Sequence, residues 1–261
     1  MQTQAYEKEW ARLQRQERQL LQRRARRREK KLDNWLSDKV PDKLEATLNA
    51  AFAKAFALIF DKGTAVIEKT YKLPDLAEQY LLDSYALQQR GEEKDLRTFS
   101  RRAGGTAALH TAVSGAAGIG LGVLGIGLAD VAVFSALLLR NVYEIAMRYG
   151  YDYEGDRERA FLLRVIAASL QWGEELYRAD AALNTFISTG GWPETKRLTE
   201  LTEDAARALS RELLTMKFLQ GIPVLGLVGG AADLLYMGRI SEYAELKYRR
   251  RFLTDRKADS R

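Results

Sequence analysis

Residues 124–152 read LGIGLADVAVFSALLLRNVYEIAMRYGYD, and residues 225–252 follow the same plan with LGLVGGAADLLYMGRISEYAELKYRRRF. Each stretch holds Leu-Gly, small apolar residues, Ala-Asp, an apolar run and an amphipathic segment with Tyr and Glu, so that Asp130 corresponds to Asp233. The apolar residues do not alternate with period 2, and this pattern favours helices over strands. We interpret the two stretches as a weak internal repeat without the period of a solenoid.

Working outward, the rest of the chain is also typical of helices. Ala, Leu, Glu, Arg and Gln dominate between only four prolines, and no alternating run is bounded by turn residues. The sequence therefore predicts an all-α, multi-helix bundle with two glycine-rich helical segments and a long basic N-terminal helix. We expect helices over residues 5–38, from Pro41 to about Phe60, 74–89, 157–187 (one or two helices) and 194–217. The helix after Pro41 has the clearest apolar stripe, formed by Leu44, Leu48, Ala51, Phe52, Ala55, Phe56, Ile59 and Phe60.

Glycines are concentrated in two windows. Each glycine destabilises a helix by about 1 kcal/mol relative to alanine, so another interaction must offset this cost. Gly118 and Gly122, and likewise Gly226 and Gly230, have the GxxxG spacing that lets helix backbones approach closely. We expect these four glycines to lie in tight helix–helix contacts.

Asp130 and Asp233 follow the two glycine windows, and three interpretations stay open for them. The aspartates are helix N-caps beside a buried turn, residues 112–139 and 218–238 dip into a bilayer, or the pair binds an ion as in a transporter repeat. Residues 112–129 carry no charge but only seven Val, Leu or Ile, so a shallow hairpin is favoured over a full span. In each case Asp130 and Asp233 are candidates for buried polar residues.

Charge is distributed unevenly along the chain, whose total is +6 from 41 Lys and Arg against 35 Asp and Glu. Residues 1–31 carry 11 basic and 4 acidic side chains, and residues 247–261 carry 7 and 2. The middle of the chain is therefore acidic, at 23 − 29 = −6. Clustered arginines are typical of contact with anionic lipid, at about 1 kcal/mol per basic residue. The candidate lipid-contact residues are Arg23, Arg24, Arg26, Arg27, Arg28, Arg249, Arg250 and Arg251.

We expect residues 12–31 to form a helix held against an anionic surface mainly by charge. The basic side chains wrap around the helix axis, so we expect no single apolar face to anchor the segment by burial. The segment lacks interleaved aromatic residues and nucleic-acid-binding motifs, and nucleic acid is therefore not the expected partner.

Few residues support catalysis, and we assign no catalytic, cofactor-binding or metal site. The chain has no cysteine and one histidine, His110, and Ser114 near it lacks the G-x-S-x-G context of a nucleophile. Asp152, Glu154 and Asp156 begin like a calcium loop but lack its later glycine and glutamate, and Glu174-Glu175 is typical of a helix N-terminus. The glycine windows also lack the Lys-Ser or Lys-Thr of a phosphate-binding loop.

The chain resembles the bacterial EcsC family over about residues 60–252. The most specific pieces are Glu144-Ile-Ala-Met-Arg-Tyr-Gly-Tyr-Asp152 and the segment from Ile222 to Ala232. The resemblance implies an α-helical protein and work linked to a membrane, since the family's namesake is encoded beside an ABC transporter; it supplies no catalytic residues. We accordingly divide the chain into a basic helical arm (1–40), an EcsC-like helical domain (41–252) and a basic, disordered tail (253–261).

These observations favour a non-enzymatic, membrane-associated protein that binds anionic lipid or a membrane complex, such as one linked to an ABC transporter. One alternative is an enzyme that acts on a lipid or apolar substrate in an interhelical cleft near Asp130 and Asp233. A second alternative is a nucleic-acid-associated scaffold acting through the basic arm. No apolar segment follows the charged N-terminus, so we expect a cytoplasmic protein, peripheral or shallowly inserted at the inner face of the cell membrane.

Overall fold

The computed structural model describes residues 2–25, 42–62, 128–219 and 231–259. These residues form seven α-helices and no strand, which confirms the all-α prediction for this part of the chain. The helices are α1 (Gln2–Ala25), α3 (Asp42–Lys62), α7 (Leu128–Arg148), α8 (Asp156–Ser169), α9 (Gly173–Thr189), α10 (Leu198–Leu219) and α11 (Ala231–Asp259).

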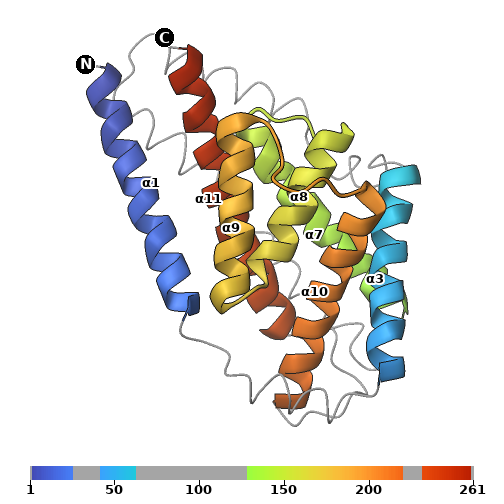
Figure 1. Cartoon of the computed structure of the whole chain (residues 1–261). Helices are drawn as coiled ribbons and strands as arrows, with labels where there is room; N and C mark the ends of the chain where they lie inside the picture. Colours follow the sequence, from blue (N-terminus) through green and yellow to red (C-terminus); the bar gives the residue numbers. More distant parts are fainter. Residues whose placement is uncertain (1, 26–41, 63–127, 220–230, 260–261) are drawn as a thin grey trace.

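The helices pack side by side in one body, with α8 and α11 near its centre (Figure 1). On one side α1 packs against α9 and α11, and on the other α3 packs against α7 and α10. The core between them is lined by fully buried aromatic side chains such as Tyr143, Phe161 and Tyr248. Burial of this apolar surface is the main force that holds the helices together.

Two of the predicted helices are observed with clear physical reasons for their bounds. The apolar stripe predicted after Pro41 lies on α3 and faces the core of the protein, where Phe52 and Phe56 are buried. The predicted segment 157–187 forms two helices, because the chain turns after α8 and enters α9 through Gly173 at a φ of +54°. The helix predicted over residues 74–89 and the glycine windows with Gly118, Gly122, Gly226 and Gly230 lie outside the described residues.

The two repeat helices, α7 and α11, run parallel to each other. Asn141 of α7 donates a hydrogen bond to Ser241 of α11. Further toward the C-terminal side of both segments, the Tyr151 hydroxyl lies 2.6 Å from the Asp255 carboxylate. Since both residue numbers rise together, the N-termini of α7 and α11 lie toward the same end of the molecule. Asp130 and Asp233 each stand third in their helix, inside the first turn rather than before it.

Helix α1 runs antiparallel to α11. Glu9 pairs with Arg249, whereas Arg23, near the other end of α1, pairs with Glu242 at 2.6 Å. The C-terminal end of α1 therefore lies beside the N-terminal half of α11. We call the end of the molecule that holds Ala25, Leu128 and Ala231 the basal end; it lies in the lower half of Figure 1.

A single stripe of α1 faces the body, although the sequence offers no apolar face by which to anchor this basic helix. The buried side chains follow one another at spacings of three or four residues, and they alternate apolar with charged groups: Ala5, Glu9, Leu13, Glu17, Leu20 and Arg24. The expectation considered only apolar residues as anchors, so it missed this mixed stripe. The predicted boundary at residue 40 lies outside the described residues and stays a prediction. The prediction of a disordered tail from residue 253 is wrong up to Asp259, because these residues continue helix α11 and Leu253 is buried.

Candidate functional site

Ion pairs buried between α1, α9 and α11 neutralise much of the basic charge near the C-terminus. The Lys247 ammonium is fully buried and lies 2.9 Å from Glu17 of α1 and 2.6 Å from Asp180 of α9. Arg250 reaches the same Glu17 at 2.5 Å. A buried amine with two carboxylate partners is charge-compensated, so this cluster orients helices rather than offering a reactive group.

The predicted lipid-contact arginines of α11 also point into the protein. Arg249 is buried and pairs with Glu9, and Arg251 lies 2.6 Å from Glu158 of α8 with its guanidinium over the Tyr151 ring at 4.0 Å. Three consecutive arginines thus meet acidic partners on two different helices. Their charge specifies how α1 and α8 sit on α11.

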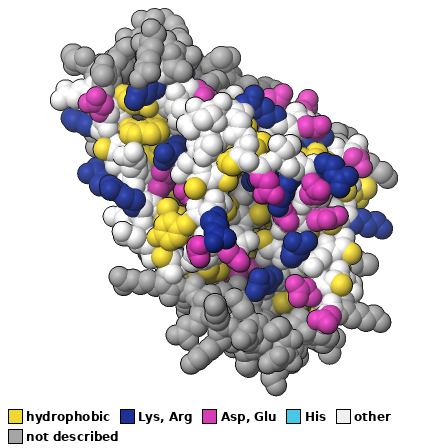
Figure 2. Space-filling model, viewed as in Figure 1, with side chains coloured by type: hydrophobic (Ala, Val, Ile, Leu, Met, Phe, Trp, Pro, Cys, Tyr) yellow, Lys and Arg dark blue, Asp and Glu magenta, His cyan; other side chains and the backbone are white. Residues whose placement is uncertain are grey.

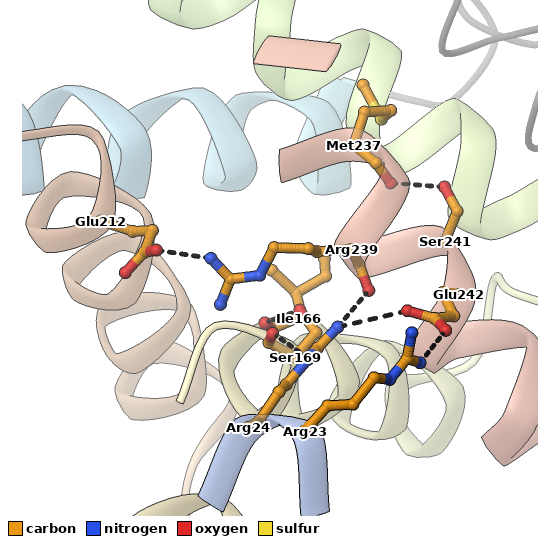
Figure 3. Close-up of polar contacts among 9 residues, drawn as sticks. All are labelled: Arg23, Arg24, Ile166, Ser169, Glu212, Met237, Arg239, Ser241 and Glu242. Carbon is orange, nitrogen blue, oxygen red and sulfur yellow. Dashed lines mark hydrogen bonds and ion pairs between the residues drawn. The ribbon is translucent and has the colours of Figure 1, made fainter. Parts of the chain in front are cut away.

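Arg24 of α1 joins three helices near the basal end (Figure 3). Its Nη1 donates to the Ser169 carbonyl oxygen at 2.6 Å, where the last turn of α8 leaves carbonyls without intrahelical partners. Its Nη2 lies 3.6 Å from the Glu242 carboxylate, which also pairs with Arg23. Burial and, next, the charge of Arg239 lower the pKa of Arg24 to about 10.

Of the eight arginines predicted to contact lipid, five therefore have partners within the protein: Arg23, Arg24, Arg249, Arg250 and Arg251. Arg26, Arg27 and Arg28 lie outside the described residues. Lipid contact by this set stays a prediction, and the burial of Arg24 and Arg249 weighs against it for those two.

A groove of about 720 Å³ opens on the face seen in Figure 2, with α8 as its floor and α9 and α10 as its walls. Half-buried and buried alanines and leucines line the bottom: Leu163, Ala167, Ala168, Leu170, Ala179, Ala182, Leu183, Leu201 and Ala208. Charged side chains stand along the edges, namely Arg164, Glu174, Glu175, Asp204, Arg207, Arg211 and Glu212. The groove therefore combines an apolar floor with a polar rim, as ligand sites do.

The basal end of the groove is closed by Trp172 and the charged residues behind it. The Arg239 guanidinium lies 4.4 Å from the centre of the Trp172 ring. Figure 3 shows the same guanidinium paired with the Glu212 carboxylate of α10, at 2.5 Å. The Trp172 indole N–H and two N–H positions of Arg239, Nε and Nη2, are buried without a hydrogen-bond partner in this part of the structure. Such unsatisfied donors need an acceptor, because an unpaired buried polar group costs about 1–3 kcal/mol.

A second, more polar cleft of about 880 Å³ lies between α1 and α11, and its lining includes Gln16, Gln19, Gln22 and Glu245. Burial raises the pKa of Glu245 to about 7, although Arg249, Tyr149 and Arg148 oppose this rise. The lining is mostly polar, so this cleft is a weaker candidate for an apolar or lipid ligand.

The other candidates from the sequence gain no support as sites. Asp152 accepts a hydrogen bond from the Glu154 backbone N–H at 2.9 Å, as in a turn, and Glu174 pairs with Arg178 on the surface of α9. Within the described ranges, no three Asp, Glu or His side chains gather closely enough to hold a metal ion. His110 and Ser114 lie outside these ranges, and the side chains of Asp130 and Asp233 are not described.

Sequence reasoning missed the groove. Alanines at positions 167, 168, 179, 182 and 208 read as ordinary helix formers, and nothing local marks them as a floor. The available signal was the small side chains on facing positions of three successive helices, which leave space that larger residues would fill. The buried acids of α1 were missed because their partners lie more than 200 residues away.

Fold and groove together define an all-α protein with a ligand-sized groove over one helix. None of the described helices combines the length and hydropathy that crossing a membrane requires. The chain belongs to the EcsC protein family, whose model matches residues 6–253 and so includes most of α1. Neither a curated protein nor a solved structure matches the chain significantly.

Proposed function

We propose that this EcsC-family protein is a membrane-associated, non-enzymatic protein that attaches to an anionic lipid surface through its basal end. The observation that carries the proposal is that the C-terminus of α1 and the N-termini of α7 and α11 lie at that end. Residue 26 follows the C-terminus of α1, and residues 127 and 230 precede the N-termini of α7 and α11. Because α1 is antiparallel and α7 parallel to α11, all three junctions lie at the basal end.

The chemistry of these segments suits an anionic membrane surface. The segment after α1 carries Arg26, Arg27, Arg28, Lys30 and Lys31, and the two other segments are the glycine-rich, mostly uncharged windows. Five basic side chains near an anionic leaflet contribute about 5 kcal/mol in favour of binding. Apolar residues joined to the same end can add shallow contact with lipid. A nucleic acid offers no apolar interior for such contact.

The residues of the groove support binding over catalysis. Its described lining offers carboxylates, arginines, a glutamine and a tryptophan, but no serine, threonine, cysteine, histidine or lysine. Hydroxyl, thiol and amine nucleophiles and a histidine base are thus missing from this lining. A membrane protein complex is a less direct candidate for the partner. The positive charge at the basal end requires only a negatively charged surface, which lipid phosphates already provide.

The test is co-sedimentation with vesicles of phosphatidylglycerol and phosphatidylcholine across a salt series. One variant changes Arg26, Arg27 and Arg28 to Gln; the control changes Arg12, Arg15 and Arg18, which are exposed on α1 further from the basal end. Both lose three charges, so only the position differs. We expect the first variant to bind about 100-fold more weakly and the control less than threefold, with wild-type binding fading toward 1 M salt.

Three results would contradict the proposal. Equal loss in both variants would show that overall charge, not the basal end, drives attachment. Binding unchanged by 1 M salt would assign attachment to apolar contact alone. Tighter binding to DNA than to the vesicles at equal salt would favour the nucleic-acid scaffold.

A further inference from the structure

We propose that the groove between α9 and α10 binds a single amphiphile with an anionic headgroup, such as one anionic lipid molecule. Its hydrocarbon chain lies on the alanine floor, and its headgroup lies beside Trp172 at the basal end. The inference rests on the proposed function, since it names the molecule that an attached protein takes from the lipid surface.

The floor accounts for the hydrocarbon chain. Ala167 of α8 and Ala179 and Ala182 of α9 are only half-buried, although fully buried leucines such as Leu163 and Leu183 lie around them. Burial of a hydrocarbon chain against such a strip gains about 25 cal/mol for each Å² of apolar surface.

The basal end accounts for a negative headgroup. Trp172 lines the basal end of the groove, and its indole N–H is a buried donor without an acceptor within the described residues; Arg239 lies behind its ring, outside the groove lining. An oxygen of a phosphate or carboxylate supplies the acceptor that the Trp172 N–H lacks. Arg207 and Arg211, exposed on the α10 wall, extend the cationic edge of the groove.

The carboxylates of the rim do not call for a cationic ligand. Asp204 lies 2.8 Å from Lys196 and also contacts Arg207, Glu174 lies 2.5 Å from Arg178, and Glu212 lies 2.5 Å from Arg239. Three of the four acids along the groove thus already have basic partners within the protein. The unsatisfied groups are donors, so the ligand headgroup must bring acceptors.

The size of the groove suits a small molecule. Small-molecule sites have volumes of about 300–1,000 Å³, and 720 Å³ lies within this range.

The experiment measures binding of monomeric palmitoyl-lysophosphatidylglycerol to the full chain by equilibrium dialysis, with palmitate and monopalmitoylglycerol as parallel ligands. Ala179→Leu and Ala182→Leu each place a larger side chain in the groove. Ala181→Leu is the matched control, since residue 181 is exposed on the same helix and does not line the groove. Trp172→Phe keeps an aromatic side chain and removes the N–H donor.

We expect each groove variant to bind lysophosphatidylglycerol at least about tenfold more weakly than the Ala181→Leu control, with thermal melts that show both folded. The neutral glyceride should bind several-fold more weakly than either anionic ligand. Trp172→Phe should remove most of that difference. Palmitate binding as tightly as the lipid would support the inference and identify a free fatty acid as an equally good source of the anionic group.

Several results would overturn the inference: no binding of any monomeric amphiphile to the wild type, equal binding in groove and control variants, or preference for the neutral glyceride. Capture of an amphipathic peptide that Ala179→Leu blocks, in place of the lipid, would also overturn it. Vesicle sedimentation separates this test from the proposed function, because Ala179→Leu leaves the basal charges intact. Monomer binding that Ala179→Leu abolishes supports the groove even if no variant sediments with vesicles.

Discussion

α1 and α3 flank the body on opposite sides, and they dock by different chemistry (Figure 1). The described part of α3 buries five side chains, and all are apolar: Leu48, Phe52, Ala55, Phe56 and Phe60. The described part of α1 buries six, and three of these are charged. Apolar burial is strong but tolerates sliding, whereas ion pairs require particular partners. α3 therefore supplies stability, and α1 supplies a defined register on α11.

The strongest test of the apolar side is Phe56→Ala. Phe56 is fully buried and stacks with Phe60, so its loss leaves a cavity between α3 and its neighbours. We expect the free energy of unfolding to fall by about 3–5 kcal/mol, measured by urea unfolding. Leu58→Ala is the control on the same helix; Leu58 is 47% exposed, and its loss should cost less than about 0.5 kcal/mol. Equal costs would show that α3 is not held by its apolar stripe.

The charged side is tested by the pair of Glu9 and Arg249. Glu9→Met or Arg249→Met alone leaves a buried charge without its main partner, and each should cost about 3 kcal/mol. The double variant removes both charges and should return to within about 1 kcal/mol of the wild type. The exposed pair of Arg178 and Glu174 is the reference, where Arg178→Met should cost less than about 0.5 kcal/mol.

A double-mutant cycle by urea unfolding measures these effects. Additive costs in the double variant would mean that the two residues act independently and that the pair does not set the register of α1.

The smallest expected effect concerns Glu245, in the cleft between α1 and α11. Burial raises its pKa to about 7 from the usual 4.5, so the folded state holds a proton that the unfolded state releases between these values. This contribution to stability is complete below about pH 4.5 and is lost as the pH rises through 7. Glu245→Gln should therefore stabilise the protein at pH 8 by up to about 3 kcal/mol, and much less at pH 5.

Urea unfolding of both proteins at pH 5 and pH 8 provides the measurement. A stability difference between the two proteins that is the same at both pH values would contradict the prediction. It would show that Glu245 titrates in its ordinary range and does not destabilise the packing of α1 against α11 at pH 8.

The contrast between α1 and α3 also explains what the sequence could predict. The stripe of α3 was predicted because apolar residues at helical spacing reveal a buried face without knowledge of the partner. The stripe of α1 contains Glu9, Glu17 and Arg24, which look solvated until Lys247, Arg249 and Arg250 are placed beside them. Local pattern cannot supply that partner, because the pairing joins residues more than 200 positions apart.

The groove was beyond sequence reasoning for a related reason. Ala167 and Ala179 are good helix formers anywhere, and they form a floor only because α9 and α10 stand apart over α8. The role of Trp172 could not be predicted from the sequence either, since its unsatisfied N–H depends on which groups the fold brings near it. The all-α class, by contrast, needed only composition and periodicity.

The pairing of α1 with α11 has a consequence for biosynthesis. Glu17 leaves the ribosome 230 residues before Lys247, its partner. At about 5–20 residues per second, the first helix waits roughly 10–50 s for that partner to be made. During this interval its acids and arginines face water or nascent-chain factors, and the long sequence separation makes closure a late step. The opening helix of this fold is therefore among the last to take its place.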